Sequence, residues 1–272
     1  MLKKIFIFTS LLTFIACTNT NEIKKEERVN LTYEELRSEQ NMMSTNWFQT
    51  SGEAKALYLQ AYNIATEKLK MALKKPTNKP YSIVLDLDET VLDNSAYSAE
   101  NIKNGKNWSQ KTWDEWVNMA EAKALPGAKE FLEFANKNKV HIYYISDRYD
   151  YQLDATLRNL EKLGIPVQDR NHILLKEKSD KSGKNNRREQ VKKHTNLIML
   201  FGDNLSDFDD FSTKSVEDRN EKVEKLGKEF GDKFIIFPNP MYGAFETAIY
   251  GGKFGDAKTL IEARRKSLKV YK

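Results

Sequence analysis

Residues 81–90 read YSIVLDLDET, an apolar run that ends in Asp86 and Asp88 with a single leucine between them. A short apolar run after a proline predicts a buried strand, and polar residues at its end are typical of a strand that delivers side chains to a sheet edge. By itself an Asp-x-Asp pair at a strand end is more often a solvated junction than a catalytic site. The segment therefore predicts a strand and marks a candidate site that needs a second cluster.

A second cluster of this kind follows another apolar run, Leu197–Phe201. It reads GDNLSDF over residues 202–208 and contains Asp203 and Asp207. If both strands end at one sheet edge, four carboxylates gather there, and their repulsion requires a cation or shared protons. Carboxylate oxygens favour a hard ion such as Mg²⁺. The two clusters together predict metal-assisted phosphoryl chemistry.

Apolar strand-like runs alternate with helical periodicity over the rest of the chain, which predicts an α/β fold with a doubly wound, mainly parallel sheet and a small α-helical cap. We expect strands at 81–85, 140–145, 172–175, 197–201 and 234–237, and helices within 31–75 (with Leu57, Ala61, Ile64, Ala65, Leu69 and Ala72 as the apolar face) and at 129–138, 153–163 closed by Gly164, 216–230 and 257–268. The α/β core is assigned to about 77–92 and 126–272, and the cap to about 33–75 and the Trp-rich stretch 93–125.

The N-terminus has the pattern of an export signal. Two lysines precede the apolar run Ile5–Ala16, which is too short for a permanent membrane span, and the chain's single cysteine, Cys17, follows it. The residues before Cys17 resemble a bacterial lipobox, with 1–16 as a signal peptide and 17–32 as a lipidated polar tether. This predicts a protein of the cell envelope, anchored in the membrane by lipid on Cys17, in the outer membrane or facing the periplasm; a plain secreted protein is the alternative.

Composition excludes several other classes of protein. A single cysteine among 272 residues excludes an internal disulfide and a cysteine-rich zinc site. The formal charge of +5 is spread along the chain without a long basic run, so nucleic acid is not expected as a ligand. The three histidines follow no phosphohistidine pattern.

Four motifs carry a resemblance to a known family. The chain resembles the haloacid dehalogenase superfamily of phosphatases at these four motifs, which are Asp86–Thr90 (DLDET), Ser146, Lys184 and Gly202–Asp207 (GDNLSD). More closely, residues 83–97 (IVLDLDETVLDNSAY) and 198–208 (IMLFGDNLSDF) are similar to both signatures of the class C bacterial acid phosphatases, lipoprotein 5′-nucleotidases of the DDDD group.

The resemblance implies a role for each motif residue. Asp86 is the implied nucleophile, which forms an aspartyl-phosphate, and Asp88 is the implied acid and base. One Mg²⁺ per site is implied, with Asp86, Asp203, Asp207 and the backbone carbonyl of Asp88 as the metal residues. Phosphate binding is implied for Ser146 and Lys184, the latter preferred over Lys181, and stacking on the substrate for Trp113 and Tyr242.

These expectations describe an exported, Mg²⁺-dependent acid phosphatase that hydrolyses nucleoside 5′-monophosphates and related monoesters such as AMP and NMN. Three alternatives stay open: preference for sugar phosphates, preference for aryl phosphates, and a surface binding lipoprotein with a vestigial site. Small phosphomonoesters and the membrane are the expected partners, and a homodimer stays open. Asp147 stands where relatives usually carry Asn, and it would oppose an anionic substrate unless Arg148 neutralises it.

Overall fold

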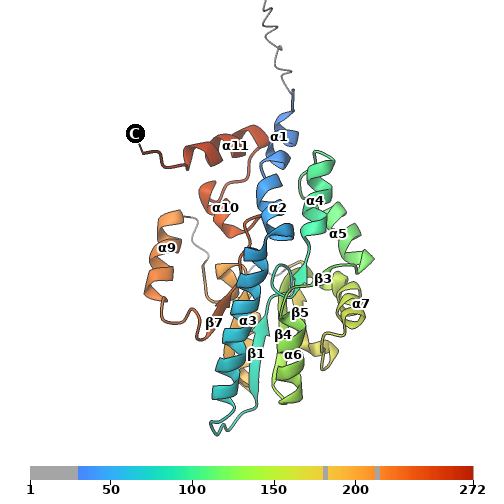
Figure 1. The fold of residues 1–272 in the computed structure, drawn as a ribbon, viewed down its shortest axis with the longest axis vertical. Coiled ribbons are helices and arrows are strands. Elements are labelled where there is room, and N and C mark those ends of the chain that lie inside the picture. Colours follow the sequence, from blue (N-terminus) through green and yellow to red (C-terminus); the bar gives the residue numbers. More distant parts are fainter. Residues whose placement is uncertain (1–29, 180–182, 212–214, 272) are drawn as a thin grey trace, which may run out of the picture. The chain divides into compact units, whose positions relative to one another are not determined.

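The computed structural model describes residues 30–179, 183–211 and 215–271 (Figure 1). The proposed signal peptide, Cys17 and nearly all of the tether lie outside these residues, as does Lys181. Helices occupy α1 (Tyr33–Glu39), α2 (Met42–Thr50), α3 (Gly52–Ala72), α4 (Ser95–Lys103), α5 (Gln110–Met119), α6 (Ala128–Lys137), α7 (Leu153–Leu163), α8 (Asn185–His194), α9 (Val216–Lys225), α10 (Ala244–Ile249) and α11 (Ala257–Lys266). Short 3₁₀ turns lie at η1 (Asp150–Gln152), η2 (Arg170–His172) and η3 (Leu205–Asp207).

A five-stranded sheet forms the centre of the unit that spans residues 31–272, and all of its strand pairs are parallel. Its strands are β1 (Tyr81–Leu85), β4 (His141–Tyr149), β5 (Ile173–Lys176), β6 (Asn196–Gly202) and β7 (Phe234–Ile236), in the order β5-β4-β1-β6-β7. The predicted doubly wound parallel sheet is confirmed. A separate antiparallel pair joins β2 (Leu92–Asp93) to β3 (Lys123–Ala124).

Successive residues of β1 enter two different cores, as the alternation of side chains along a strand requires. Ile83 and Leu85 belong to the larger core, which α3, α6 and α7 complete. Val84 belongs to a smaller core on the other face, with Val191 of α8 and Phe208 after η3. Helices therefore cover both faces, and only the strand ends are available for a site.

The position of α3 corrects part of the predicted cap. The whole stretch 33–75 was assigned to the cap, but α3 packs on the sheet through Tyr58, Tyr62, Ala65 and Leu69 (Figure 1). Helix α3 packs there because its face toward the sheet is aromatic: the rings of Tyr58 and Tyr62 fill the core beside Phe237, the residue that follows β7. The shorter helices α1 and α2 both contact α4, and α1 also contacts α11.

Most expected elements fall within a few residues of the observed ones, with three notable differences. The strand expected at 140–145 is longer in the structure, where β4 continues to Tyr149. Ser146 therefore lies inside the strand rather than after it. The helix expected at 216–230 ends at Lys225. The sequence pattern did not predict α8, whose residues NNRREQVKKH lack an apolar face. Within the part of the chain described, no helix combines the length and apolarity needed to cross a bilayer.

Candidate active site

The strand order places the two aspartate clusters at the natural binding position of the sheet. From β1 the chain proceeds outward through β4 and β5, and then returns to the other side of β1 as β6. The crevice at such a reversal, beyond the carboxyl ends of the strands, is where open α/β sheets bind ligands. Asp86 follows β1 directly, and its backbone N–H donates to the carbonyl of Phe201 in β6 at 3.0 Å.

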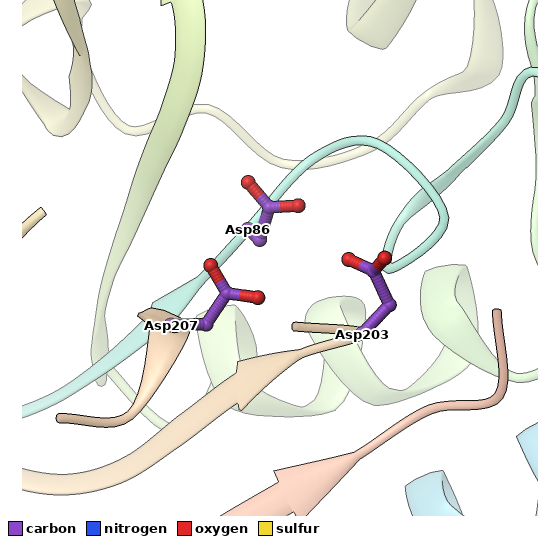
Figure 2. A group of neighbouring side chains, drawn as sticks. All are labelled: Asp86, Asp203 and Asp207. Carbon is purple, nitrogen blue, oxygen red and sulfur yellow. The ribbon is translucent and has the colours of Figure 1, made fainter. Parts of the chain in front are cut away.

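Three carboxylates converge in this crevice. Asp86, Asp203 and Asp207 each offer an oxygen, and these oxygens lie within 4.8 Å of one another (Figure 2). Figure 2 shows the three side chains directed toward a common space, Asp86 from the end of β1 and the other two from the segment after β6. The predicted convergence of the clusters at one sheet edge is confirmed for these three residues.

Gly202 makes the close approach of Asp207 possible. A Cβ at position 202 would lie 2.1 Å from Oδ2 of Asp207 and 2.3 Å from its Cβ, so no larger residue fits without a shift. The short η3 turn returns the chain toward β6, and the N–H of Asn204 donates to Oδ2 of Asp207 at 2.9 Å. The glycine in the GDNLSD motif is therefore a steric requirement of the cluster.

Lys184 supplies the positive charge nearest to the cluster. Its buried ammonium donates to Asp207 Oδ1 at 2.6 Å and also to Asp86. Burial would lower the pKa of Lys184, but the charges of Asp207 and Asp86 outweigh that effect and raise the pKa well above its ordinary value. The two carboxylates thus favour the protonated form of Lys184. Lys181 lies outside the described residues.

One ammonium does not balance three carboxylates. Burial raises the pKa of Asp203 to about 7, with the charge of Asp207 as the next cause, and burial likewise raises the pKa of Asp86 despite Lys184. An all-oxygen set of ligands with excess negative charge fits a hard divalent cation. Asp86, Asp203 and Asp207 are the residues that would hold it.

Asp88 belongs to a different set of contacts. Its carboxylate accepts from Arg148 Nη2 at 2.7 Å, from Asn94 Nδ2 at 2.9 Å and from Ser146 Oγ at 3.5 Å. Arg148 is buried, and its Nη1 also donates to Thr156 at 3.1 Å. These donors fix the carboxylate of Asp88 beside the cluster without placing it among the three converging oxygens.

Buried hydroxyl groups shape the loop that carries Asp86 and Asp88. Tyr62 donates to the carbonyl of Thr90 at 2.8 Å, and Tyr58 donates to the carbonyl of Glu89. Glu89 has φ of 54° and is fully buried, where its Oε1 accepts from the N–H of Asn94 at 2.8 Å. Helix α3 therefore holds the loop that carries Asp86 and Asp88 through two hydrogen bonds.

Asp147 has a different partner from the one expected. Neighbouring strand residues point to opposite faces, so Arg148 turns to Asp88 while Asp147 pairs with Arg187 of α8 at 2.9 Å. Partial desolvation would raise the pKa of Asp147, but the charge of Lys184 and the hydrogen bond and charge of Arg187 outweigh it and hold that pKa below its ordinary value. Arg148 therefore binds Asp88, and the cation that pairs with Asp147 is Arg187.

A pocket of about 380 Å³ connects these groups. Its walls include all of the sequence-predicted site residues among those described: Asp86, Asp88, Ser146, Lys184, Asp203, Asp207, Trp113 and Tyr242. Trp113 packs edge-on against Tyr97 at 5.2 Å and lies 5.6 Å from the Arg148 guanidinium, whereas Tyr242 is 38% exposed. The walls of the pocket therefore include both the carboxylate cluster and several aromatic rings.

Sequence reasoning missed several residues that position this site. Asn94 bridges Asp88 and Trp116, whose indole N–H donates to Asn94 Oδ1 at 2.8 Å. Asn239 donates to Asp203 Oδ2 at 2.8 Å. Asn94 stands in the quoted stretch 83–97, but a polar side chain in a loop gives no local sign of which carboxylate it will contact.

Several known proteins have similar sequences and structures. The family model of the HAD superfamily, subfamily IIIB (acid phosphatase), matches residues 8–245. The class C acid phosphatase from Bacillus anthracis is 48% identical with a TM-score of 0.83, over 87% of this chain and 99% of that one. A structure of that enzyme with tungstate bound is 50% identical, also with a TM-score of 0.83, over 88% and 100% of the two chains.

A more distant relative is the stem 31 kDa glycoprotein of Glycine max, which is 26% identical over 209 residues, 72% of this chain and 70% of that protein. The parallel sheet, the converging aspartates and the family match over most of the chain lead to one assignment. The chain belongs to subfamily IIIB of the HAD superfamily and is an acid phosphatase of the class C type.

Proposed function

We propose that this acid phosphatase hydrolyses nucleoside 5′-monophosphates and related phosphomonoesters such as NMN, with Mg²⁺ as its metal. The observation that carries the proposal is the pocket, which joins the carboxylate cluster to Trp113, Tyr97 and Tyr242. A phosphate at the carboxylate end would leave the organic group among aromatic rings, which stack on heterocycles of any kind. Tungstate is a tetrahedral oxyanion like phosphate, and its presence in the structure of the 50% identical relative supports an oxyanion ligand.

Asp86 is the proposed nucleophile. Its carboxylate attacks phosphorus to form an aspartyl-phosphate, and the bond to the leaving oxygen breaks. Lys184, in contact with Asp86, reduces the repulsion between this carboxylate and the anionic ester. A bound Mg²⁺ would supply further shielding of the phosphoryl oxygens.

Asp88 is the proposed acid and base. It gives its proton to the leaving oxygen in the first step. In the second step it removes a proton from the attacking water, whose oxygen bonds to phosphorus as the bond to Asp86 breaks, so inorganic phosphate leaves and the enzyme returns to its starting state. The contacts with Arg148 and Asn94 restrict where its carboxylate can point. Ser146, whose hydroxyl lies 3.5 Å from Asp88 Oδ2, is placed to donate to a phosphoryl oxygen as well.

Phosphate release from AMP, NMN, glucose 6-phosphate and phosphotyrosine tests the proposal, measured at pH 5–6 with Mg²⁺ or with EDTA. We expect release from AMP and NMN that requires the metal and disappears in Asp86→Asn. Asp150→Asn is a matched control, because Asp150 is exposed on η1 and lies outside the pocket walls. Preference for the sugar or aryl ester would overturn the nucleotidase assignment, and binding without turnover of any ester would favour the binding lipoprotein.

Metal binding has its own readout in thermal unfolding. Mg²⁺ should raise the melting temperature, because a cation that binds only the folded state relieves repulsion within the cluster. Asp203→Asn should remove most of this shift, and Asp150→Asn should keep it. A shift of equal size in Asp203→Asn would place the metal elsewhere.

We further propose that the protein is exported and anchored in the cell envelope by lipid on Cys17, with residues 1–16 removed. The support is the sequence pattern alone. Cys17→Ser should move the phosphatase from the membrane fraction to the soluble fraction, whereas Thr18→Ser should leave it in the membrane fraction. Retention of the Cys17→Ser variant in membranes would contradict the anchor.

A further inference from the structure

The part of the pocket formed by α1 and the loop after α4 carries cationic side chains that the proposed mechanism does not use. Arg37 of α1 and Lys106 of that loop both line the pocket. In Figure 1, α1 lies beyond α2 as seen from the sheet, whereas Asp86 and Asp203 directly follow the strands β1 and β6. The pocket is thus lined by carboxylates, aromatic rings and two further cations.

Backbone contacts hold these two cations at the same wall. The hydroxyl of Ser38, the residue after Arg37, donates to the carbonyl of Lys106 at 2.7 Å and to that of Asn101 at 3.3 Å. On the other side of α1, Arg264 Nη1 donates to the carbonyl of Arg37 at 3.4 Å. Helix α1 is therefore fixed from two sides, and the wall is a built feature rather than a loose terminal helix.

Some of the charged side chains at this wall are paired with an opposite charge and others are not. Arg264 forms an ion pair with Glu246, which also lines the pocket. Among the residues that the structure describes, neither Arg37 nor Lys106 has a carboxylate partner, and the buried Nε of Arg37 has no hydrogen-bond acceptor. A guanidinium without a partner on a pocket wall is suited to bind a carboxylate or another planar anion.

We propose that Arg37, assisted by Lys106, recognises an anionic group on the far end of the leaving group. The preferred substrates are then phosphomonoesters whose aromatic ring carries a carboxylate. The inference rests on the proposed function, since the phosphate must occupy the carboxylate end for the ring substituent to reach α1. The amide side chains of Asn41 and Asn101, which also line the pocket, can accept or donate and so do not oppose such a group.

Nicotinate mononucleotide and nicotinamide mononucleotide test this proposal directly. They share the phosphate, the ribose and the ring, and differ only in the ring substituent, which is a carboxylate in the first and a carboxamide in the second. We expect kcat/KM of the wild type to be about tenfold higher for nicotinate mononucleotide than for nicotinamide mononucleotide. This factor corresponds to one hydrogen bond to a charged group. Arg37→Gln should remove most of this preference by raising KM for nicotinate mononucleotide. Lys106→Gln should reduce the preference by a smaller factor.

Arg265→Gln is the matched control, since Arg265 is an exposed arginine of α11 that lies outside the pocket walls, and its removal should keep the preference. Equal kcat/KM for both esters in the wild type, or a preference that survives Arg37→Gln, would overturn the inference while leaving the phosphatase proposal intact. Equal loss in Arg265→Gln would show a general charge effect and also overturn it. Absence of turnover with either nucleotide and with AMP would instead overturn the proposed function, and the inference with it.

Discussion

The guanidinium of Arg148 binds both carboxylate oxygens of Asp88, with Nε 3.0 Å from Oδ1 and 3.1 Å from Oδ2, and Nη2 2.7 Å from Oδ1. The arginine side chain is 1% exposed and the aspartate side chain 17% exposed. The two residues come from the ends of neighbouring elements, the loop after β1 and the last part of β4. A fork of this kind fixes both the position and the plane of the carboxylate.

Replacement of Arg148 by Lys should lower kcat about 10- to 100-fold, because a lysine keeps the charge but cannot hold both oxygens, and small errors in position cost that much. Steady-state kinetics on a nucleoside monophosphate measures the effect. Arg170→Lys is the control, since Arg170 pairs with Asp154 on the surface and should change nothing. Full activity in Arg148→Lys would show that the fork is not needed to orient Asp88.

Gly202→Ala should abolish metal-dependent turnover and destabilise the fold by about 1–3 kcal/mol, because the new methyl group overlaps Asp207. Chemical denaturation gives the free energy of unfolding, and the Mg²⁺-induced shift in melting temperature reports the cluster. Gly52→Ala is the matched control: a Cβ there meets nothing within 4 Å, and the residue begins helix α3, so stability should be unchanged or slightly higher. An active Gly202→Ala enzyme would mean that η3 can move without cost.

Local patterns explain why the sheet and the aspartate cluster could be predicted from the sequence. The run Ile83–Leu85 is apolar on both faces of a strand, and Gly164, with φ of 65°, ends α7 where the periodicity stops. Given parallel strands, the convergence of Asp86 and Asp203 follows from topology alone. None of these inferences requires knowledge of a distant contact.

The misplaced features depend on distant contacts. Helix α3 falls within the stretch expected in the cap, but the rings of Tyr58 and Tyr62 fill the core and their hydroxyls donate to loop carbonyls some thirty residues away. Helix α8 was missed because two of its buried residues, Arg187 and Arg188, bind backbone carbonyls of Ser146 and Ser206. Periodicity of apolar residues does not detect a buried face made of arginines.

Tyr62 links the stability of the fold to alkaline pH. Burial, followed by the charge of Tyr144, raises the pKa of Tyr62 well above its ordinary value of 10.0. The unfolded chain therefore loses its phenol proton first, so stability is complete below about pH 10 and falls above it by about 1.4 kcal/mol per pH unit for each such group. Tyr58 and Tyr144, which are also buried with raised pKa, add to this slope.

Tyr62→Phe should cost about 1 kcal/mol at pH 7, because the carbonyl of Thr90 loses its donor, yet it should make the decline above pH 10 less steep. Urea unfolding at pH values from 7 to about 11 measures both effects. Tyr33→Phe, at an exposed position, is the control for loss of a phenol. An unchanged slope in Tyr62→Phe would show that this hydroxyl does not stay protonated in the folded protein.

Asp147→Asn should lower KM for an anionic monoester about two- to fivefold, with kcat nearly unchanged. Asp147 lines the pocket, its side chain is 58% exposed, and Lys184 and Arg187 hold its pKa below the ordinary value, so it is a carboxylate at the acid pH of the assay. Loss of that charge removes repulsion of the incoming phosphate, and Asn can still accept from Arg187.

The ratio of the two KM values should shrink at high ionic strength, because an exposed charge is screened by salt. Asp150→Asn removes a nearby surface charge outside the pocket walls and should leave KM unchanged. A higher KM in Asp147→Asn would reverse the interpretation: the carboxylate would then serve the substrate indirectly, because its pairing with Arg187 would hold α8, and with it Lys184, in place.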